Sequence, residues 1–203
     1  MSIKAVAFDY GGVIAFFQDN QAIQDLANLA GIDASLMRKI YWDNRSIYDE
    51  GLVDGYNFFK NILADVGVFA DQDLLEKLVI TDIESWAHVN PKSEELVREL
   101  KGRGVKIGML SNIVPDFLNR IKERLPVFAL MDCAVFSCDA GMVKPDKKIY
   151  QLLLSRLGCQ ADELVFFDDL DANVKAALDL GIHAFLWKSP EEGRKELEKF
   201  GVI

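Results

Sequence analysis

In the second half of the chain, short apolar runs alternate with segments in which apolar residues recur at helical spacing. Runs typical of buried strands lie at 105–110, 133–138, 164–168 and 183–187. Helical segments open at Asn90 and Pro91, cover 115–125 and 145–157, and begin again at Asp171. Together with an apolar run from Ile3 to Phe8, this order predicts an α/β fold, in which helices cover both faces of a parallel sheet.

Residues 16–89 show helical periodicity and no convincing strand. Helices are expected at 21–30, 34–42, 54–66 and 71–86. We therefore predict a helical cap domain at 16–89, inserted after the first strand of a core formed by residues 1–15 and 90–203. Because the insertion begins soon after Asp9, it is expected to lie over the carboxyl end of the sheet as a lid.

Composition narrows the possible partners and location. The 203 residues, half of them hydrophobic, suffice for a large core, and the net charge of −9 argues against nucleic acid and anionic membranes as partners. The cysteines Cys133, Cys138 and Cys159 form no CxxC pair, which disfavours a zinc site or a disulfide framework. With no basic cleavable leader and no apolar run of ~18 residues, a cytoplasmic location is expected.

Polar residues follow four of the predicted strands. They are Asp9, the pair Ser111-Asn112, the pair Lys144-Pro145 and the pair Asp168-Asp169. Binding sites of open α/β sheets lie outside the carboxyl ends of the strands. We therefore expect the four clusters to converge on one crevice.

Asp9 follows a buried strand, where a carboxylate is unfavourable unless it is paired or bound to a cation. It could attack phosphorus and form an aspartyl-phosphate, with a divalent metal relieving the charge repulsion. Gly11 and Gly12 would let main-chain groups approach a phosphate and a metal closely. A carboxylate that only closes the first turn explains Asp9 taken alone equally well.

Asp168, Asp169 and Asn173 offer the hard oxygen ligands that Mg²⁺ prefers. Because strand side chains alternate, Asp169 is expected to bind the metal directly and Asp168 to support it. A helix N-cap is the alternative. Ser111, Asn112 and Lys144 could bind phosphate oxygens, although a turn and a surface lysine are the simpler interpretations of each alone.

The four clusters together resemble the motifs of the haloacid dehalogenase superfamily, in order and in broad spacing. The matching residues are Phe8-Asp9-Tyr10-Gly11-Gly12-Val13, Leu110-Ser111-Asn112, Lys144-Pro145 and Phe167-Asp168-Asp169 through Asn173. Segments 137–146 and 167–173 are most similar to the branch that holds the phosphatase domain of soluble epoxide hydrolases and bacterial sugar-1-phosphate phosphatases. The resemblance implies a Rossmann-like core with a helical cap. It also implies magnesium-dependent hydrolysis of a small phosphorylated metabolite, with a sugar phosphate favoured, through an aspartyl-phosphate.

The resemblance also implies a role for each residue. Asp9 would be the nucleophile and a metal ligand, the Gly11 carbonyl a second ligand and Asp169 a third, supported by Asp168 and Asn173. Ser111, Asn112 and the main chain at Gly11 and Gly12 would hold the phosphoryl group, and Lys144 would stabilise its charge.

Position 11 departs from the pattern of the superfamily. Its phosphatases usually have an acid/base aspartate two residues after the nucleophile, where this chain has Gly11. Such a proton donor is typically worth about 10²–10⁴ in rate. Substrates with good leaving groups, such as anomeric sugar phosphates or acyl phosphates, are therefore favoured. The resembling branch includes members with the same glycine.

Other functions stay open at this point. A 2-haloacid dehalogenase would use the same aspartate without a metal, but usually lacks the paired acidic motif. A non-catalytic phosphate-binding or regulatory protein is suggested by Gly11, and a phospho-accepting signalling domain is disfavoured by the insertion. The sequence does not define the oligomeric state.

A cluster of aromatic and charged residues in the predicted cap could face the substrate. Its members are Tyr41, Trp42, Asp43, Asn44, Arg45, Tyr48 and Glu50. At helical spacing, however, aromatic residues more often belong to the core.

Overall fold

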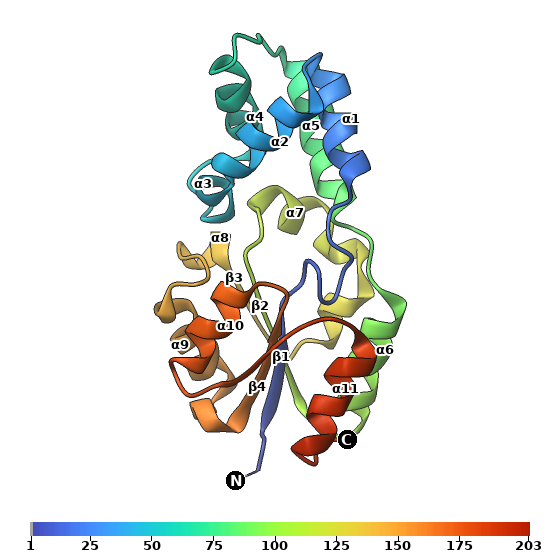
Figure 1. Cartoon of the computed structure of the whole chain (residues 1–203), viewed down its shortest axis with the longest axis vertical. Coiled ribbons are helices and arrows are strands. Elements are labelled where there is room, and N and C mark those ends of the chain that lie inside the picture. Colours follow the sequence, from blue (N-terminus) through green and yellow to red (C-terminus); the bar gives the residue numbers. More distant parts are fainter. Residues whose placement is uncertain (1) are drawn as a thin grey trace.

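A computed structural model describes residues 2–203 and shows a five-stranded parallel sheet beneath a group of helices (Figure 1). The strands are β1 (Ala5–Phe8), β2 (Lys106–Ser111), β3 (Cys133–Phe136), β4 (Leu164–Asp168) and β5 (His183–Leu186). Their order is β3-β2-β1-β4-β5, and each neighbouring pair is parallel. The predicted α/β fold is confirmed. Met1, with which the predicted core begins, lies outside the described residues.

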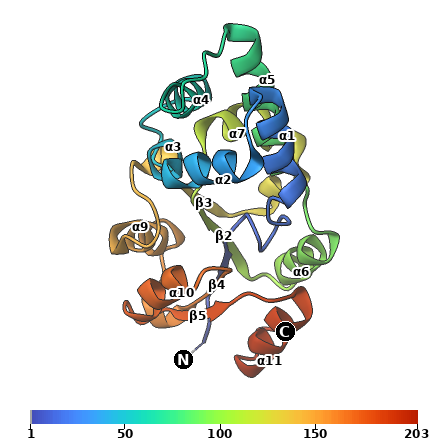
Figure 2. The same cartoon turned by 45° about the horizontal axis from the view of Figure 1, so that its top comes forward.

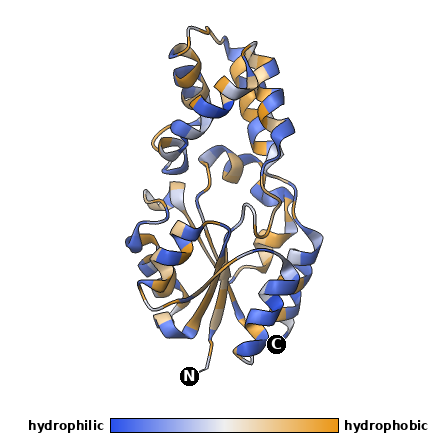
Figure 3. Ribbon diagram, viewed as in Figure 1, coloured by the Kyte–Doolittle hydropathy of each residue, from blue (hydrophilic) through white to orange (hydrophobic). Residues whose placement is uncertain are grey.

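Helices cover both faces of the sheet because the strands are apolar on both sides. In β1, Val6 and Phe8 belong to the core beneath α6 (Pro91–Gly102) and α11 (Pro190–Lys199). Ala5 and Ala7 belong to a second core beneath α9 (Lys147–Leu157) and α10 (Asp171–Leu178). Figure 3 shows the hydrophobic sheet between these two helical layers. The alternation of side chains along the central strand therefore supplies both cores.

The predicted boundaries need two corrections between β2 and α9. The helix expected at 115–125 is shorter, because α7 covers Pro115–Arg120 and a 3₁₀ turn follows at Lys122–Arg124. The strand expected to reach residue 138 ends at Phe136, and α8 (Ser137–Ala140) begins there. The Ser137 hydroxyl accepts the Ile113 N–H (2.9 Å) and donates to the Asp49 carbonyl (2.5 Å), which turns the chain out of the sheet. Two further 3₁₀ turns lie at Pro126–Leu130 and Ala161–Glu163.

Besides α8, two helices were not anticipated from the sequence pattern. The first is α11, a strongly charged helix that begins after Ser189, whose hydroxyl accepts the Glu192 N–H. The second is α3 (Arg45–Asp49), which is too short to show periodicity. No helix within residues 2–203 is long and apolar enough to cross a membrane.

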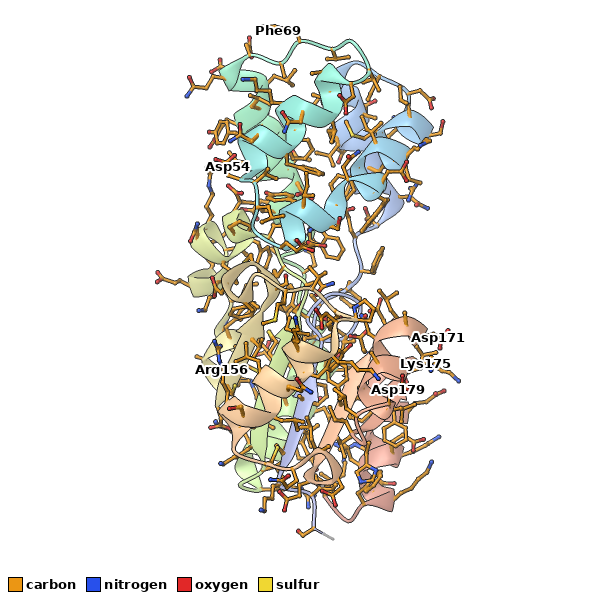
Figure 4. The ribbon with its side chains drawn as sticks, turned by 90° about the vertical axis from the view of Figure 1, so that its left-hand side faces the viewer. Asp54, Phe69, Arg156, Asp171, Lys175 and Asp179 are labelled. Atoms are coloured by element: carbon orange, nitrogen blue, oxygen red, sulfur yellow. The ribbon has the colours of Figure 1, made fainter. Side chains whose placement is uncertain are left out.

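Five helices form a separate group over the carboxyl ends of the strands (Figures 1 and 2). They are α1 (Asn20–Ala30), α2 (Ala34–Asp43), α3, α4 (Gly55–Ala64) and α5 (Gln72–Ser85). All but α3 begin after an aspartate whose side chain accepts a main-chain N–H, namely Asp19, Asp33, Asp54 and Asp71. We call this group the cap. Figure 4 shows Phe69 at the end of the cap farthest from the sheet, and Asp171, Lys175 and Asp179 on the solvent side of α10.

The two chain segments that join the cap to the sheet run side by side. The Phe16 N–H donates to the His88 carbonyl, and the Asn90 N–H donates to the Ile14 carbonyl, each at 2.9 Å. This geometry supports the division into residues 1–15 with 90–203 and residues 16–89, which stays a prediction.

A buried charge network holds the cap helices together. The Asp82 carboxylate of α5 is inaccessible to solvent, and its Oδ1 accepts hydrogen bonds from the Tyr41 hydroxyl (2.6 Å) and Gln18 Nε2 (3.3 Å). Arg45 Nη1 lies 3.7 Å from the same oxygen, and Arg45 Nε lies 2.9 Å from Asp49 Oδ1. Burial raises the pKa of Asp82 to about 6, despite the opposing effect of Arg45. The network connects α2, α3 and α5 with the segment that leads into the cap.

We predict that the wild-type protein loses stability relative to an Asp82→Asn variant as the pH rises from about 4 to about 6. In this window the folded protein keeps the proton on Asp82, whereas the unfolded chain, with the ordinary pKa of 3.8, has released it. Rising pH therefore favours the unfolded state, by at most about 3 kcal/mol. Urea denaturation of both proteins at several pH values measures the effect. A constant difference between the two stability curves would contradict it.

Candidate active site

The predicted residues at the carboxyl ends of the strands line a cavity of about 130 Å³ between the sheet and the cap. Those that reach its surface are Asp9, Gly11, Ser111, Asn112, Lys144, Asp169 and Asn173. Gly12 and Asp168 lie against this group, Gly12 beside Asp169 and Asp168 beside Lys144. The sheet order explains the convergence, because β1 lies between β2 and β4.

Lys144 joins two carboxylates at the centre of the site. Its Nζ lies 2.8 Å from Asp9 Oδ2 and 2.5 Å from Asp168 Oδ2. All three side chains are buried, which excludes the solvated surface lysine considered above. Burial by itself would lower the pKa of Lys144, but Asp9 and Asp168 together raise it. The ammonium group is therefore charged and held in place.

Protein groups engage both oxygens of the Asp168 carboxylate. Oδ1 accepts hydrogen bonds from the Leu170 N–H (3.0 Å) and Asn173 Nδ2 (2.9 Å), while Oδ2 accepts one from Lys144. The Asp169 side chain instead borders the cavity. This difference supports the predicted division of roles, with Asp169 as the direct metal ligand and Asp168 as its support. The N-cap position of α10 is Leu170, so neither aspartate is the N-cap residue of that helix.

The carboxylates suit a divalent cation. Asp9, Asp168 and Asp169 each offer an oxygen, and the three atoms lie within 4.8 Å of one another. Burial raises the pKa of Asp9 to about 7, with Asp168 adding to the effect and Lys144 opposing it. Burial and the nearby Asp168 raise the pKa of Asp169 to about 6. One lysine does not balance three carboxylates, of which Asp9 and Asp168 are buried and Asp169 is partly buried, and a hard cation such as Mg²⁺ would supply the missing positive charge.

Asn112 holds the loop that carries Lys144. Its Oδ1 accepts the Lys144 N–H at 2.8 Å, and its Nδ2 donates to the Lys144 carbonyl at 3.1 Å. An amide NH2 carries two hydrogens, so Nδ2 can still donate to a phosphate, as can the main-chain N–H, and the phosphate contact of Asn112 stays a prediction. Ser111 lies beside it at the end of β2, with its hydroxyl-bearing side chain in the cavity wall.

The two glycines after Asp9 leave room for two different side chains. A Cβ at Gly12, where φ is 73°, would overlap Oδ2 of Asp169. A Cβ at Gly11 would lie 2.9 Å from Cζ3 of Trp86. The Trp86 residue is tied to the site because its carbonyl accepts the Tyr10 hydroxyl at 2.9 Å. The indole of Trp86 therefore occupies the space into which an aspartate at position 11 would extend.

Several cavity residues were not found from the sequence. From the cap they are Phe17, Asp49 and Trp86, and from the core they are Tyr10, Ile113, Val114, Phe117 and Leu170. Among the candidate cap residues, Trp42 and Arg45 do line the cavity, whereas Tyr41 and Tyr48 are fully buried core residues. The helical spacing could not separate these two groups, because both lie on neighbouring turns of α2 and α3.

The fold and the site agree with comparisons to known proteins. The model of the haloacid dehalogenase-like hydrolase family matches residues 3–181. The chain belongs to this family. A protein of Mycobacterium tuberculosis named as a phosphatase is 27% identical over 215 aligned positions, which cover 100% of this chain and 97% of that protein. A sesquiterpene phosphatase of Aspergillus oryzae is 27% identical over 184 positions, covering 89% of this chain and 88% of its own.

Among solved structures, the chain resembles a haloacid dehalogenase family enzyme of Bacteroides thetaiotaomicron in complex with magnesium and inorganic phosphate. The TM-score is 0.75 at 20% identity, over 92% of this chain and 95% of the other. At this identity the likeness concerns the fold. It confirms the Rossmann-like core that the motif resemblance implied.

We predict that Gly12→Ala destabilises the protein more than Gly31→Ala does. The two glycines have similar φ values, 73° and 69°, so alanine incurs a similar backbone strain of about 1–2 kcal/mol at each. Only at Gly12 does the new methyl group collide with a neighbour, Asp169, since nothing lies within 4 Å of a Cβ at Gly31. Denaturant unfolding gives the free energy of unfolding of both variants, and the difference between them measures the cost of the collision. Equal losses of unfolding free energy would show that Asp169 does not pack against Gly12.

Proposed function

We propose that this protein is a magnesium-dependent phosphatase that hydrolyses a small phosphorylated metabolite through an aspartyl-phosphate intermediate, in the cytoplasm. The observation that carries the proposal is the cluster beneath the cap of the buried Asp9, Lys144 and Asp168 with the partly buried Asp169. The phosphatase names of two relatives that match most of the chain support it. A sugar phosphate, including a sugar-1-phosphate, remains within the proposed substrate class.

The surroundings of Asp9 suit a nucleophile. The Tyr10 N–H donates to Asp9 Oδ1 at 2.7 Å, and Lys144 donates to Oδ2, so the carboxylate is oriented at the end of β1. In the first step an Asp9 oxygen attacks phosphorus, and the bond from phosphorus to the leaving oxygen breaks with its electron pair. Lys144 neutralises charge on the nucleophile and on the transferring phosphoryl group. Water then cleaves the aspartyl-phosphate and restores Asp9.

The metal ligands in this proposal are Asp9, the Gly11 carbonyl and Asp169, with Asp168 and Asn173 behind them. Bound magnesium would screen the repulsion between the carboxylate and the phosphate. The magnesium complex of the Bacteroides enzyme supports this choice of ion. The phosphoryl oxygens would meet Ser111 and the main-chain N–H groups near Gly12 and Asn112.

Dehalogenation is the second candidate, because it needs the same aspartate. The acidic pair Asp168-Asp169 favours the phosphatase, since a dehalogenase would use no metal and three carboxylates so close together call for one. A phosphate-binding protein without turnover is suggested only by the absence of a side chain at position 11.

The deciding experiment measures phosphate release from sugar phosphates, nucleotides and acyl phosphates, with magnesium and with a chelator. We expect magnesium-dependent turnover, reduced at least about 10³-fold by Asp9→Asn because the nucleophile is lost. The matched control is Asp25→Asn, which changes an exposed carboxylate of α1 and should leave turnover unchanged. Turnover that survives the chelator or Asp9→Asn would contradict the proposal. Halide release from 2-haloacids without magnesium would favour the dehalogenase.

We predict that Gly11→Asp lowers phosphate release instead of restoring an acid/base group. The new side chain would begin 2.9 Å from the Trp86 ring and would displace either the ring or the turn after Asp9. Adding Trp86→Ala removes the obstacle, so the double variant should be more active than Gly11→Asp alone. Steady-state rates on a simple alkyl phosphate compare the variants. A single variant faster than the wild type would show that Trp86 does not block this position.

A further inference from the structure

The cap side of the cavity is a corner of three aromatic rings. The rings of Phe17 and Trp42 are stacked, with centroids 5.9 Å apart and planes at 15°. The Trp86 ring stands across both, 5.3 Å from Phe17 at 78° and 6.4 Å from Trp42 at 84°. Phe17 is 52% exposed and Trp42 37% exposed, although both line the cavity. Large aromatic surfaces left open in a cavity bind apolar groups.

The core side of the cavity continues this apolar surface beyond the phosphate-binding residues. Its lining residues there are Ile113, Val114, Phe117 and Leu170. Leu170 is 54% exposed, at the turn between Asp169 and α10. A group attached to a phosphate at Asp9 would therefore meet apolar side chains from both the cap and the core.

The charged groups in this wall already have partners. The guanidinium of Arg45 is buried, pairs with Asp49 at 2.9 Å and lies 3.7 Å from Asp82. Its central carbon lies 5.1–5.9 Å from the ring centroids of Tyr41, Trp42, Tyr48 and Trp86. Within residues 2–203, the cations that line the cavity are Arg45 and Lys144, and both are paired with carboxylates. A second anionic group on the substrate would find no free cation here.

A sugar would also fit this wall poorly. The C–H face of a sugar could stack on one of the rings of Phe17, Trp42 and Trp86, but its hydroxyls would lose water against the other two. A polar group that is desolvated without a new hydrogen bond is strongly unfavourable. A flat apolar ring has no hydroxyls to desolvate, and it gains contact with the faces of these aromatic side chains. An apolar cavity of about 150 Å³ in another protein holds benzene. The cavity of about 130 Å³ also includes the phosphate end, so its enclosed part accommodates no more than a single ring.

We infer that the substrate is the monophosphate ester of an alcohol with one aromatic ring, which lies among Phe17, Trp42 and Trp86. This inference rests on the proposed phosphatase activity and narrows its substrate class away from sugar phosphates and bisphosphates. The ester and one water give the aromatic alcohol and inorganic phosphate. The leaving oxygen takes its proton from water, since Gly11 offers none.

The test compares kcat/KM for phenethyl phosphate, octyl phosphate and a hexose phosphate esterified at its primary hydroxyl, with acetyl phosphate as a reference. Hydrolysis of each of the first three esters releases a primary alcohol, so these substrates differ chiefly in the group attached to the phosphate. Burial of the ring should favour phenethyl phosphate over the hexose phosphate by about 10–100-fold. A rate on the hexose phosphate equal to or above that on phenethyl phosphate overturns the inference and leaves the phosphatase proposal intact. Preference for octyl phosphate overturns the aromatic assignment.

Variants connect the preference to the rings. Trp42→Ala should raise KM for phenethyl phosphate about tenfold and change KM for the hexose phosphate much less. Ile80→Ala, at an exposed site of α5 away from the cavity, is the control and should change neither. If Trp42→Ala unfolds at a much lower temperature than the wild-type protein, Phe17→Leu is used in its place. An equal effect on both esters overturns the inference.

Failure of the two proposals can be told apart. Absence of phosphate release from every ester and from acetyl phosphate overturns the phosphatase and, with it, the substrate class. Saturable binding of phenethyl alcohol, observed by ligand NMR and weakened by Trp42→Ala, supports the aromatic pocket without any hydrolysis. Phosphate release together with no saturable binding of the alcohol overturns the pocket alone.

Discussion

The structure depends on one buried ammonium group shared by two carboxylates. Lys144 comes from the loop before α9, Asp9 from the end of β1 and Asp168 from the end of β4, so a single ion cluster joins three parts of the core. An unpaired charge at any of these positions would be strongly unfavourable, because the side chains are cut off from water. The surrounding hydrogen bonds from Asn112 and Asn173 fix the partners in place. A third carboxylate, Asp169, leaves the cluster with more negative than positive charge, which favours a bound cation.

The position of the cap determines what else this cluster meets. Asp116 at the start of α7 accepts hydrogen bonds from the Tyr48 hydroxyl (3.0 Å) and the Gly55 N–H (2.7 Å), which fastens α3 and α4 to the core. The Ser137 hydroxyl adds a bond to the Asp49 carbonyl. These contacts lie beside the cavity, and they bring Trp42 and Arg45 over the end of the sheet. Together with ion pairs of Arg120 with Glu76 and of Arg124 with Glu84, they hold the cap over the core, to which two antiparallel connecting segments join it.

The fold and the polar half of the site were accessible from the sequence because both follow from local patterns. Alternating strand and helix periods predict a parallel sheet. Residues that follow such strands meet at its carboxyl edge, whatever the exact boundaries of the helices. The aromatic half was accessible only in part, because Trp42 was among the candidate cap residues but Phe17 and Trp86 were not. Trp86 reaches the site through contacts with Tyr10 and Phe17, far away in the chain, and those contacts depend on how the cap docks. The hydrogen bonds between the side-chain amide of Asn112 and the main chain of Lys144 could not be predicted either, because the two residues lie 32 positions apart in the chain.

The absence of an acid at position 11 and the aromatic wall both follow from the packing of Trp86 against Gly11. A glycine after Asp9 lets the Trp86 ring approach to a distance at which a Cβ would not fit. The ring in turn stands across Phe17 and Trp42 and completes the corner beside the nucleophile. An aspartate at this position would supply a proton but would require the ring to move, and the apolar corner would open. In the phosphatase that we propose, the site gives up acid assistance and keeps a surface for the leaving group, so that binding energy away from phosphorus can position the ester for attack.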